Sequence, residues 1–122
     1  MTPEIQARIT AENAERGRKN RKYGEGFEIR CLAKVKRSKG CLNACRSAGS
    51  RGLFDVFGYY KGYIRCIVCK TNGYIEPSQR RALKKFFNKV KDNPFYRIEI
   101  HSKDEKKRRI IEKRVRKEDD IA

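Results

Sequence analysis

Two short runs rich in β-forming residues are separated only by a Lys61-Gly62 pair. The runs cover residues 53–60 and 63–70, and they hold the tyrosine, phenylalanine, valine and isoleucine side chains that strands favour. A two-residue connection that contains glycine suits a tight turn. The pattern therefore predicts a β-hairpin, which a strand over residues 41–46 precedes across a glycine-rich bend at 48–52.

Helical periodicity flanks these strands on both sides. Residues 26–39 and 79–90 each place apolar side chains on one helical stripe, with Gly40 ending the first helix and Ser78 capping the second. The first stripe consists of Phe27, Cys31, Leu32 and Val35. Residues 95–101 alternate apolar and polar side chains, which predicts a half-buried fourth strand.

The two ends of the chain differ from this core. Thr2-Pro3-Glu4 is a typical helix start, and we expect that helix to stop at Gly17, before a basic linker over residues 18–22. The expected organisation is an arm at 1–22, a core at 23–101 and a charged helix or tail at 102–122. The order of elements predicts a mixed α/β layered domain.

The charge of the chain indicates its class of partner. The 122 residues include 32 lysines and arginines against 15 acids, a formal net charge of +17. Such a surplus favours a polyanion, nucleic acid above all. An anionic membrane is the weaker alternative, because the chain has no long apolar run and no signal-like segment. A highly charged, solvated surface without a partner is the other alternative.

Cysteine and histidine usage bears on compartment and chemistry. Five cysteines and no secretion signal predict a reducing cytoplasm, of a cell or of the host of a virus. Cys41 with Cys45 and Cys66 with Cys69 could be zinc pairs, but the spacing favours buried free thiols. The single histidine, His101, is expected at the surface end of a strand, which disfavours histidine-based acid–base catalysis.

Asp55 is an acid among apolar residues in the second predicted strand. Strand alternation and the turn at Lys61-Gly62 place it opposite Val68, with Lys70 as a diagonal neighbour. Glu28 lies on the edge of the first helical stripe and joins them if its helix packs on that face. Two carboxylates suit Mg²⁺, and a lysine can hold the nucleophile or a phosphate. A plain Asp55–Lys70 ion pair, and a Glu28 without a task, are the alternatives.

Three motifs in this order resemble the PD-(D/E)xK nuclease superfamily and, more narrowly, the archaeal-type Holliday junction resolvases of cells and viruses. They are Gly24-Glu-Gly-Phe-Glu28, Arg46-Ser-Ala-Gly-Ser-Arg-Gly-Leu-Phe-Asp55 and Ile67-Val-Cys-Lys70. The resemblance covers residues 23–101 and implies a restriction-endonuclease-like core of order αβββαβ. It also implies a homodimer that cuts branched DNA, such as a four-way junction, with Mg²⁺ or Mn²⁺ as cofactor.

The resemblance also implies roles for individual residues. Asp55 and Glu28 would be metal ligands, and Lys70 would be the catalytic lysine. Ser50 would lie in the bend by the scissile phosphate. The arginines that would contact phosphates are Arg46 and Arg51.

One position departs from the family pattern. The family's second acid stands two positions before the lysine, where this chain has Val68, and valine cannot ligate a metal. Glu76, in the loop after the third strand, or Glu25 could fill the gap. The alternative is a catalytically reduced DNA-binding protein of the same fold.

Other side chains point to DNA and to a second subunit. Basic clusters along the chain can follow a DNA backbone, and the residues singled out for this role are Lys34, Arg80 and Arg81. Five aromatic residues exceed what one small sheet needs to bury, which predicts a dimer surface. These residues are Tyr59, Tyr60, Tyr63, Phe86 and Phe87.

Overall fold

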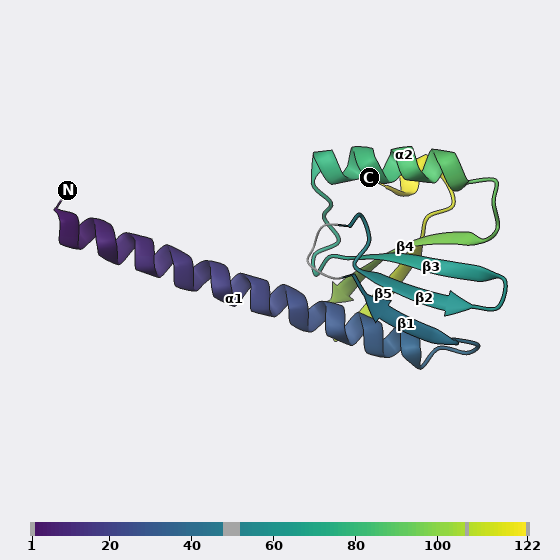
Figure 1. Ribbon diagram of the computed structural model, residues 1–122, viewed down its shortest axis with the longest axis horizontal. Coiled ribbons are helices and arrows are strands. Elements are labelled where there is room, and N and C mark those ends of the chain that lie inside the picture. The colour runs from purple at the N-terminus through teal and green to yellow at the C-terminus, as the bar shows by residue number, and fades with distance from the viewer. Residues whose placement is uncertain (1, 48–51, 107, 122) are drawn as a thin grey trace.

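A computed structural model describes residues 2–47, 52–106 and 108–121, with the side chains of residues 15–24 outside that description. A five-stranded sheet lies between two helices, one on each face (Figure 1). The elements are α1 (Pro3–Lys36), β1 (Asn43–Arg46), β2 (Val56–Tyr60), β3 (Tyr63–Cys69), α2 (Pro77–Val90), β4 (Tyr96–Asp104), β5 (Arg109–Arg114) and the short 3₁₀ helix η2 (Glu118–Asp120). The predicted order of a helix, three strands, a helix and a strand is therefore found in a mixed α/β domain.

The strands lie in the sheet in the order of the sequence, from β1 to β5. β1, β2 and β3 are antiparallel to one another, β3 and β4 are parallel, and β5 returns antiparallel to β4. A parallel pair needs a long crossover, and α2 supplies it between β3 and β4. The predicted hairpin is present, because Tyr60 pairs with Tyr63 on either side of the turn.

The core has two layers because side chains alternate along the strands. On β3, Ile67 and Cys69 face α1, whereas Cys66 and Val68 face α2. The α1-side layer consists of Phe27, Cys31, Val35, Ala44, Val56, Ile67 and Cys69. The α2-side layer consists of Phe54, Cys66, Val68, Ile75, Leu83, Phe87, Ile98, Ile100, Val115 and Ile121.

The first helix is longer than the sequence predicts. Thr2 is its N-cap, as expected, and accepts a hydrogen bond from the Ile5 N–H at 3.3 Å. The predicted stop at Gly17 and the linker at 18–22 are wrong, since α1 continues without a break to Lys36. One interior glycine costs only about 1 kcal/mol relative to alanine, and its neighbours are mostly helix-forming residues. The N-terminal part of α1 projects beyond the sheet (Figure 1).

The end of the chain completes the sheet. The helix or tail predicted after residue 102 is wrong, because β4 runs on to Asp104 and β5 pairs with it from Arg109 to Arg114. Without β5, the backbone groups of β4 would form an open edge. Val115 and Ile121 then enter the α2-side layer.

Candidate functional site

Asp55 lies directly before β2, at the end of the sheet where β3 stops. Its N–H donates to the Ile67 carbonyl at 2.8 Å, and its carbonyl accepts from the Ser47 N–H at 2.9 Å. Its carboxylate Oδ2 accepts a hydrogen bond from the Cys69 N–H at 2.8 Å. The register, in which Val56 pairs with Ile67, puts Asp55 level with Val68 as predicted. Three backbone contacts therefore fix the carboxylate beside the start of the loop that carries Lys70.

Opposing influences act on the charge of Asp55. Burial raises its pKa above the ordinary value, while the Cys69 hydrogen bond and the charges of Lys70 and Arg46 act in the other direction. Lys70 is thus an electrostatic neighbour of Asp55, as the sequence predicts. A half-buried carboxylate beside two cations is the kind of group that a functional site collects.

Arg46 links the helix to this end of the sheet. Its Nη2 donates to Glu28 Oε2 at 3.1 Å, and its Nη1 donates to Glu25 Oε1 at 3.4 Å. The hydrogen bond to Glu28 raises the pKa of Arg46. The Nε of Arg46 is buried and has no hydrogen-bond partner within the described part of the chain. One guanidinium therefore contacts both helix acids and stands close to Asp55.

The acids meet in a different way from the one predicted. Glu28 was to join Asp55 if its helix packed on the face of Val68, but this condition is not met, because α1 covers the opposite face, which carries Ile67 and Cys69. Its apolar stripe fits that face, and Asp55, which precedes the strand, is not bound by strand alternation. Contact with Cys31 and burial raise the pKa of Cys69, and the charges of Asp55 and Glu28 add to this effect. Both acids therefore lie near Cys69, at the end of the sheet.

The oxygen ligands of this site suit a hard divalent cation. Mg²⁺ in proteins usually keeps several waters and binds through one or two carboxylates plus substrate phosphates. Asp55 and Glu28 are two such carboxylates, and Asp55 uses only Oδ2 in its described hydrogen bond. Within the described ranges, no group of three or more His, Cys, Asp or Glu side chains is placed to hold a metal. A cation held by these two carboxylates would have to take its remaining ligands from water and phosphate.

The two candidates for the missing acid differ in position. Glu25 shares Arg46 with Glu28, so it is connected to the site. Glu76 is the exposed N-cap residue of α2, where its carbonyl accepts from the Arg80 N–H at 2.8 Å. No contact among the described residues joins Glu76 to Asp55.

Of the remaining predicted residues, those that the structure describes lie on α1 and α2. Ser50 and Arg51 lie outside the described residues. Lys34 reaches β5, where its Nζ donates to the Ile110 carbonyl at 3.2 Å. Arg80 donates to the Ile75 carbonyl at 2.9 Å and lies over the Tyr74 ring, whereas Arg81 is exposed on α2.

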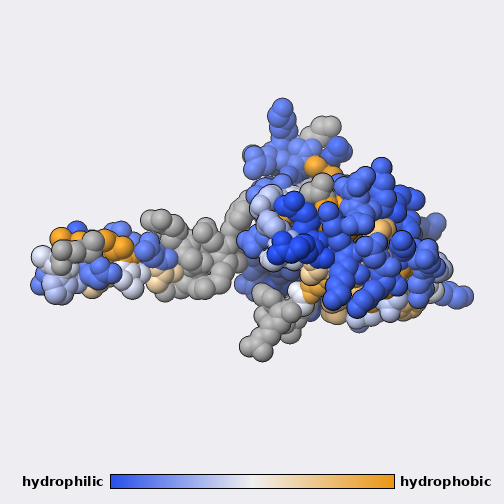
Figure 2. Space-filling view, turned by 90° about the horizontal axis from the view of Figure 1, so that it is seen from above, coloured by the Kyte–Doolittle hydropathy of each residue, from blue (hydrophilic) through white to orange (hydrophobic). Residues whose placement is uncertain are grey.

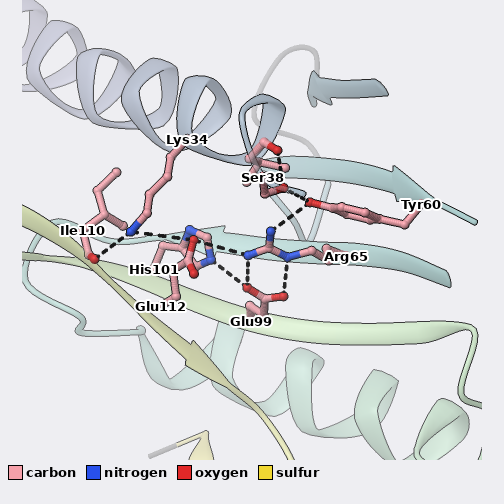
Figure 3. A network of polar contacts seen from close by, with 9 residues as sticks. Lys34, Ser38, Tyr60, Arg65, Glu99, His101, Ile110 and Glu112 are labelled. Carbon is pink, nitrogen blue, oxygen red and sulfur yellow. Dashed lines mark hydrogen bonds and ion pairs between the residues drawn. The ribbon is translucent and has the colours of Figure 1, made fainter. Parts of the chain in front are cut away.

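A buried polar network was missed by the sequence analysis (Figure 3). The side chain of Arg65 on β3 donates to both oxygens of Glu99 on β4, at 2.6 and 2.5 Å, and to the Tyr60 hydroxyl at 2.9 Å. Nε2 of His101 lies 2.9 Å from Glu99 Oε1. The prediction that His101 is a surface residue is wrong, because its side chain is 0% exposed. Both faces of β4 are covered in the sheet, which alternation along one strand does not reveal. The sequence signal for the network was a single charged residue within each of two apolar strand runs, Arg65 in β3 and Glu99 in β4.

The cysteines do not gather in one place. Cys66 belongs to the α2-side layer and Cys69 to the α1-side layer, so the two side chains lie on opposite faces of the sheet. Cys45 is exposed, and all five cysteines are free thiols. Cys31 and Cys69 are in contact beneath α1.

Most of the five aromatic side chains of the predicted dimer surface are covered within the protein itself. Tyr60 and Phe87 are buried, and Tyr63 and Phe86 are partly buried. Only Tyr59 among the five is exposed. Aromatic exposure therefore gives little support to a dimer.

Comparisons with protein-family models, with curated proteins and with solved structures find no match to this chain. Among the described residues, no helix combines the length and the apolar character needed to cross a membrane.

Proposed function

We propose that the protein is a metal-dependent, structure-selective DNA endonuclease that hydrolyses phosphodiesters in branched DNA, as the archaeal-type Holliday junction resolvases do. One observation carries the proposal. The half-buried carboxylate of Asp55 stands beside the charges of Lys70 and Arg46, at the end of the sheet to which Arg46 also brings Glu28. An acid, an amine and a second acid at one sheet end are the parts that phosphodiester hydrolysis needs.

The architecture supports the same proposal. The element order αβββαβ, with β1 to β3 antiparallel and β4 parallel to β3, agrees with the restriction-endonuclease-like core that the motifs imply. In this arrangement the Asp55 segment and the end of β3 lie side by side. The segments that resemble the second and third motifs of the family are therefore in contact, which supports the proposal.

Each polar residue of the site has a task in this chemistry. A divalent cation at Asp55 and Glu28 would activate a water and stabilise charge on the phosphate. Lys70, whose charge acts on Asp55, would hold the nucleophile or a phosphate oxygen. The guanidinium of Arg46, which binds Glu28 in this structure, can instead bind a phosphate and so release the Glu28 carboxylate.

The substrate follows from charge. With a net charge of +17, the chain binds a polyanion through phosphate contacts. The molecular surface seen from the α2 side is mainly hydrophilic (Figure 2). We further propose a homodimer, since two sites are needed to cut a four-way junction symmetrically.

A junction-cleavage assay tests the proposal. Labelled four-way junction is incubated with the protein in Mg²⁺, Mn²⁺ or EDTA, and we expect paired symmetric nicks with either metal and none with EDTA. Asp55→Asn should slow cleavage at least roughly 100-fold, since it removes a charged ligand worth several kcal/mol in the transition state. Asp92→Asn, at an exposed position after α2, is the matched control and should cleave at the wild-type rate.

A catalytically reduced DNA-binding protein of the same fold is the second candidate. It is favoured by Val68, which is 0% exposed in the α2-side layer and offers no ligand where the family has an acid. The pairing of Glu28 with Arg46 favours it as well, because the paired carboxylate is already neutralised. Tight junction binding without nicks in either metal would decide for this candidate and against the nuclease.

A further inference from the structure

Three arginines gather on and after β4 and β5, toward the edge of the sheet that lies farthest from β1. Arg97 lies at the start of β4, Arg114 ends β5, and Arg116 follows two residues later. Arg114 pairs with Glu99, which is level with Ile67, so the cluster is separated from Asp55 mainly across the strands. From β2 to β5 there are three strand spacings, which correspond to about 14 Å. This arginine cluster (Arg97, Arg114 and Arg116) is therefore distinct from the proposed nuclease site.

The cluster borders two hollows. One has a volume of about 240 Å³ and is lined by all three arginines together with Lys91. The other, of about 340 Å³, is lined by Arg97, Arg114 and Lys39. The two hollows share Arg97 and Arg114, so the guanidinium groups stand between them.

The guanidinium groups of the cluster are not paired with a carboxylate within the described part of the chain. None of the three forms an ion pair with Asp or Glu there, and the Nε of Arg97 is buried without a hydrogen-bond partner. The two acids at the larger hollow, Glu99 and Glu112, contact Arg65 at 2.5 and 3.4 Å. The charge of Glu99 acts on Arg114 without a direct contact, so the cluster keeps an excess of positive charge.

The like charges of the cluster act on one another. Desolvation lowers the pKa of Arg114 below its ordinary value, the charges of Arg97 and Arg116 lower it further, and the charge of Glu99 only partly offsets them. An anion bound among the arginines would reduce this repulsion.

Arg97 is held in place before any ligand arrives. Its guanidinium lies over the Tyr63 ring at 4.6 Å, and that ring stacks on Tyr60 at 4.7 Å with an interplanar angle of 2°. An ordered arginine loses less side-chain entropy when it binds. A stacked guanidinium still presents its edge donors to a planar or tetrahedral oxyanion.

We propose that the arginine cluster is a phosphate-binding site, independent of the nuclease site, which takes a free phosphate or pyrophosphate or a phosphate of a nucleic-acid backbone. The paired N–H donors of a guanidinium match the geometry of phosphate oxygens. All three arginines line the smaller hollow, and Arg97 and Arg114 also line the larger one. The site does not depend on catalysis at Asp55 and would remain in a protein that cuts nothing.

The test uses inorganic pyrophosphate with the full chain. Isothermal titration calorimetry is performed on the wild type, on Arg114→Gln/Arg116→Gln and on the control Arg8→Gln/Lys36→Gln, which removes the same charge from exposed positions on α1. We expect saturable binding by the wild type and the control, and an affinity lowered at least roughly tenfold in the cluster variant. Thermal unfolding in NaCl shows whether each variant is folded, and pyrophosphate should raise the Tm of the wild type above that in NaCl of equal ionic strength.

Competition distinguishes the two sources of phosphate. If a short single-stranded oligonucleotide displaces pyrophosphate from the wild type, the site takes backbone phosphates; if it does not, the site takes free phosphate. The proposal is overturned if pyrophosphate binding is not saturable, or if the cluster variant and the control lose affinity equally. Because no cleavage is measured, an inactive nuclease leaves this result unaffected.

Discussion

Glu99 is the residue on which the buried polar network depends. It is 4% exposed, and its carboxylate is shared by Arg65 and His101. Glu99→Gln removes the charge but keeps the shape, so Arg65 is left as a buried cation with a neutral partner. We expect the free energy of unfolding to fall by about 3–5 kcal/mol, as when a buried ion pair loses one member. Urea denaturation measures this free energy of unfolding. The exposed Glu105→Gln is the control, and it should change the free energy of unfolding by under about 0.5 kcal/mol.

The pH dependence of stability gives a second readout of Glu99. Burial alone would raise its pKa, but the hydrogen bonds and charges of His101 and Arg65 outweigh burial and lower it from 4.5 to about 2. A lowered pKa stabilises the folded state above pH 4.5, and the contribution is lost as the pH falls from 4.5 towards 2. The wild type should therefore lose its advantage over Glu99→Gln in acid. An unchanged difference at pH 2.5 and pH 7 would contradict this assignment.

At the scale of single residues, the sequence predicted neighbours within one hairpin better than contacts between separate elements. The neighbours Asp55 and Lys70 follow from strand period and turn position, and the structure has them as neighbours. The link from Arg46 to Glu28 did not follow, because it depends on where a helix lies over the sheet. His101 was misplaced for the same reason, since alternation within one strand cannot show that both faces are covered.

At the scale of elements, α1 and β2 approach closely at one glycine. A Cβ at Gly58 would lie 2.7 Å from Cγ1 of Val35, which is fully buried on α1. Gly58→Ala should therefore push the helix from the sheet and lower the free energy of unfolding by about 1–3 kcal/mol. Gly26→Ala is the matched control on α1, with no atom within 4 Å of the added Cβ.

The control should change stability in the opposite direction. Alanine is the better helix former, so Gly26→Ala is expected to stabilise by about 0.5–1 kcal/mol. Urea midpoints of both variants decide the matter. Equal destabilisation by both substitutions would mean that the docking of α1 on β2 is not as tight as the structure has it.

Element type proved easier to predict than element length. The apolar stripes of both helices and the hairpin at Lys61-Gly62 are local patterns, and both are present in the structure. The long α1 was missed because Gly17 has only a weak local preference against helix. β5 was missed because its pairing with β4 is decided by the open edge of β4, whereas its own sequence has four charged residues and two adjacent isoleucines, which do not alternate.

At the scale of the whole molecule, positive charge is present at two places that are separated across the sheet. Arg46 and Lys70 lie beside Asp55, next to β1 and β2, whereas the arginine cluster lies on and after β4 and β5. Such a distribution lets a polyanion contact the protein over a length greater than one active site. Contacts of this kind are made with the phosphates and not with the bases, so binding should depend little on DNA sequence.

A salt titration of DNA binding tests this description of the molecule. If the protein neutralises about six phosphates, the logarithm of the association constant should fall with the logarithm of the salt concentration with a slope of about −5. Two duplexes of equal length and unrelated sequence should give the same slope and similar affinities. Fluorescence anisotropy at several KCl concentrations provides the measurement. A shallow slope, or a strong preference for one sequence, would mean that base contacts and not the charge of +17 govern binding.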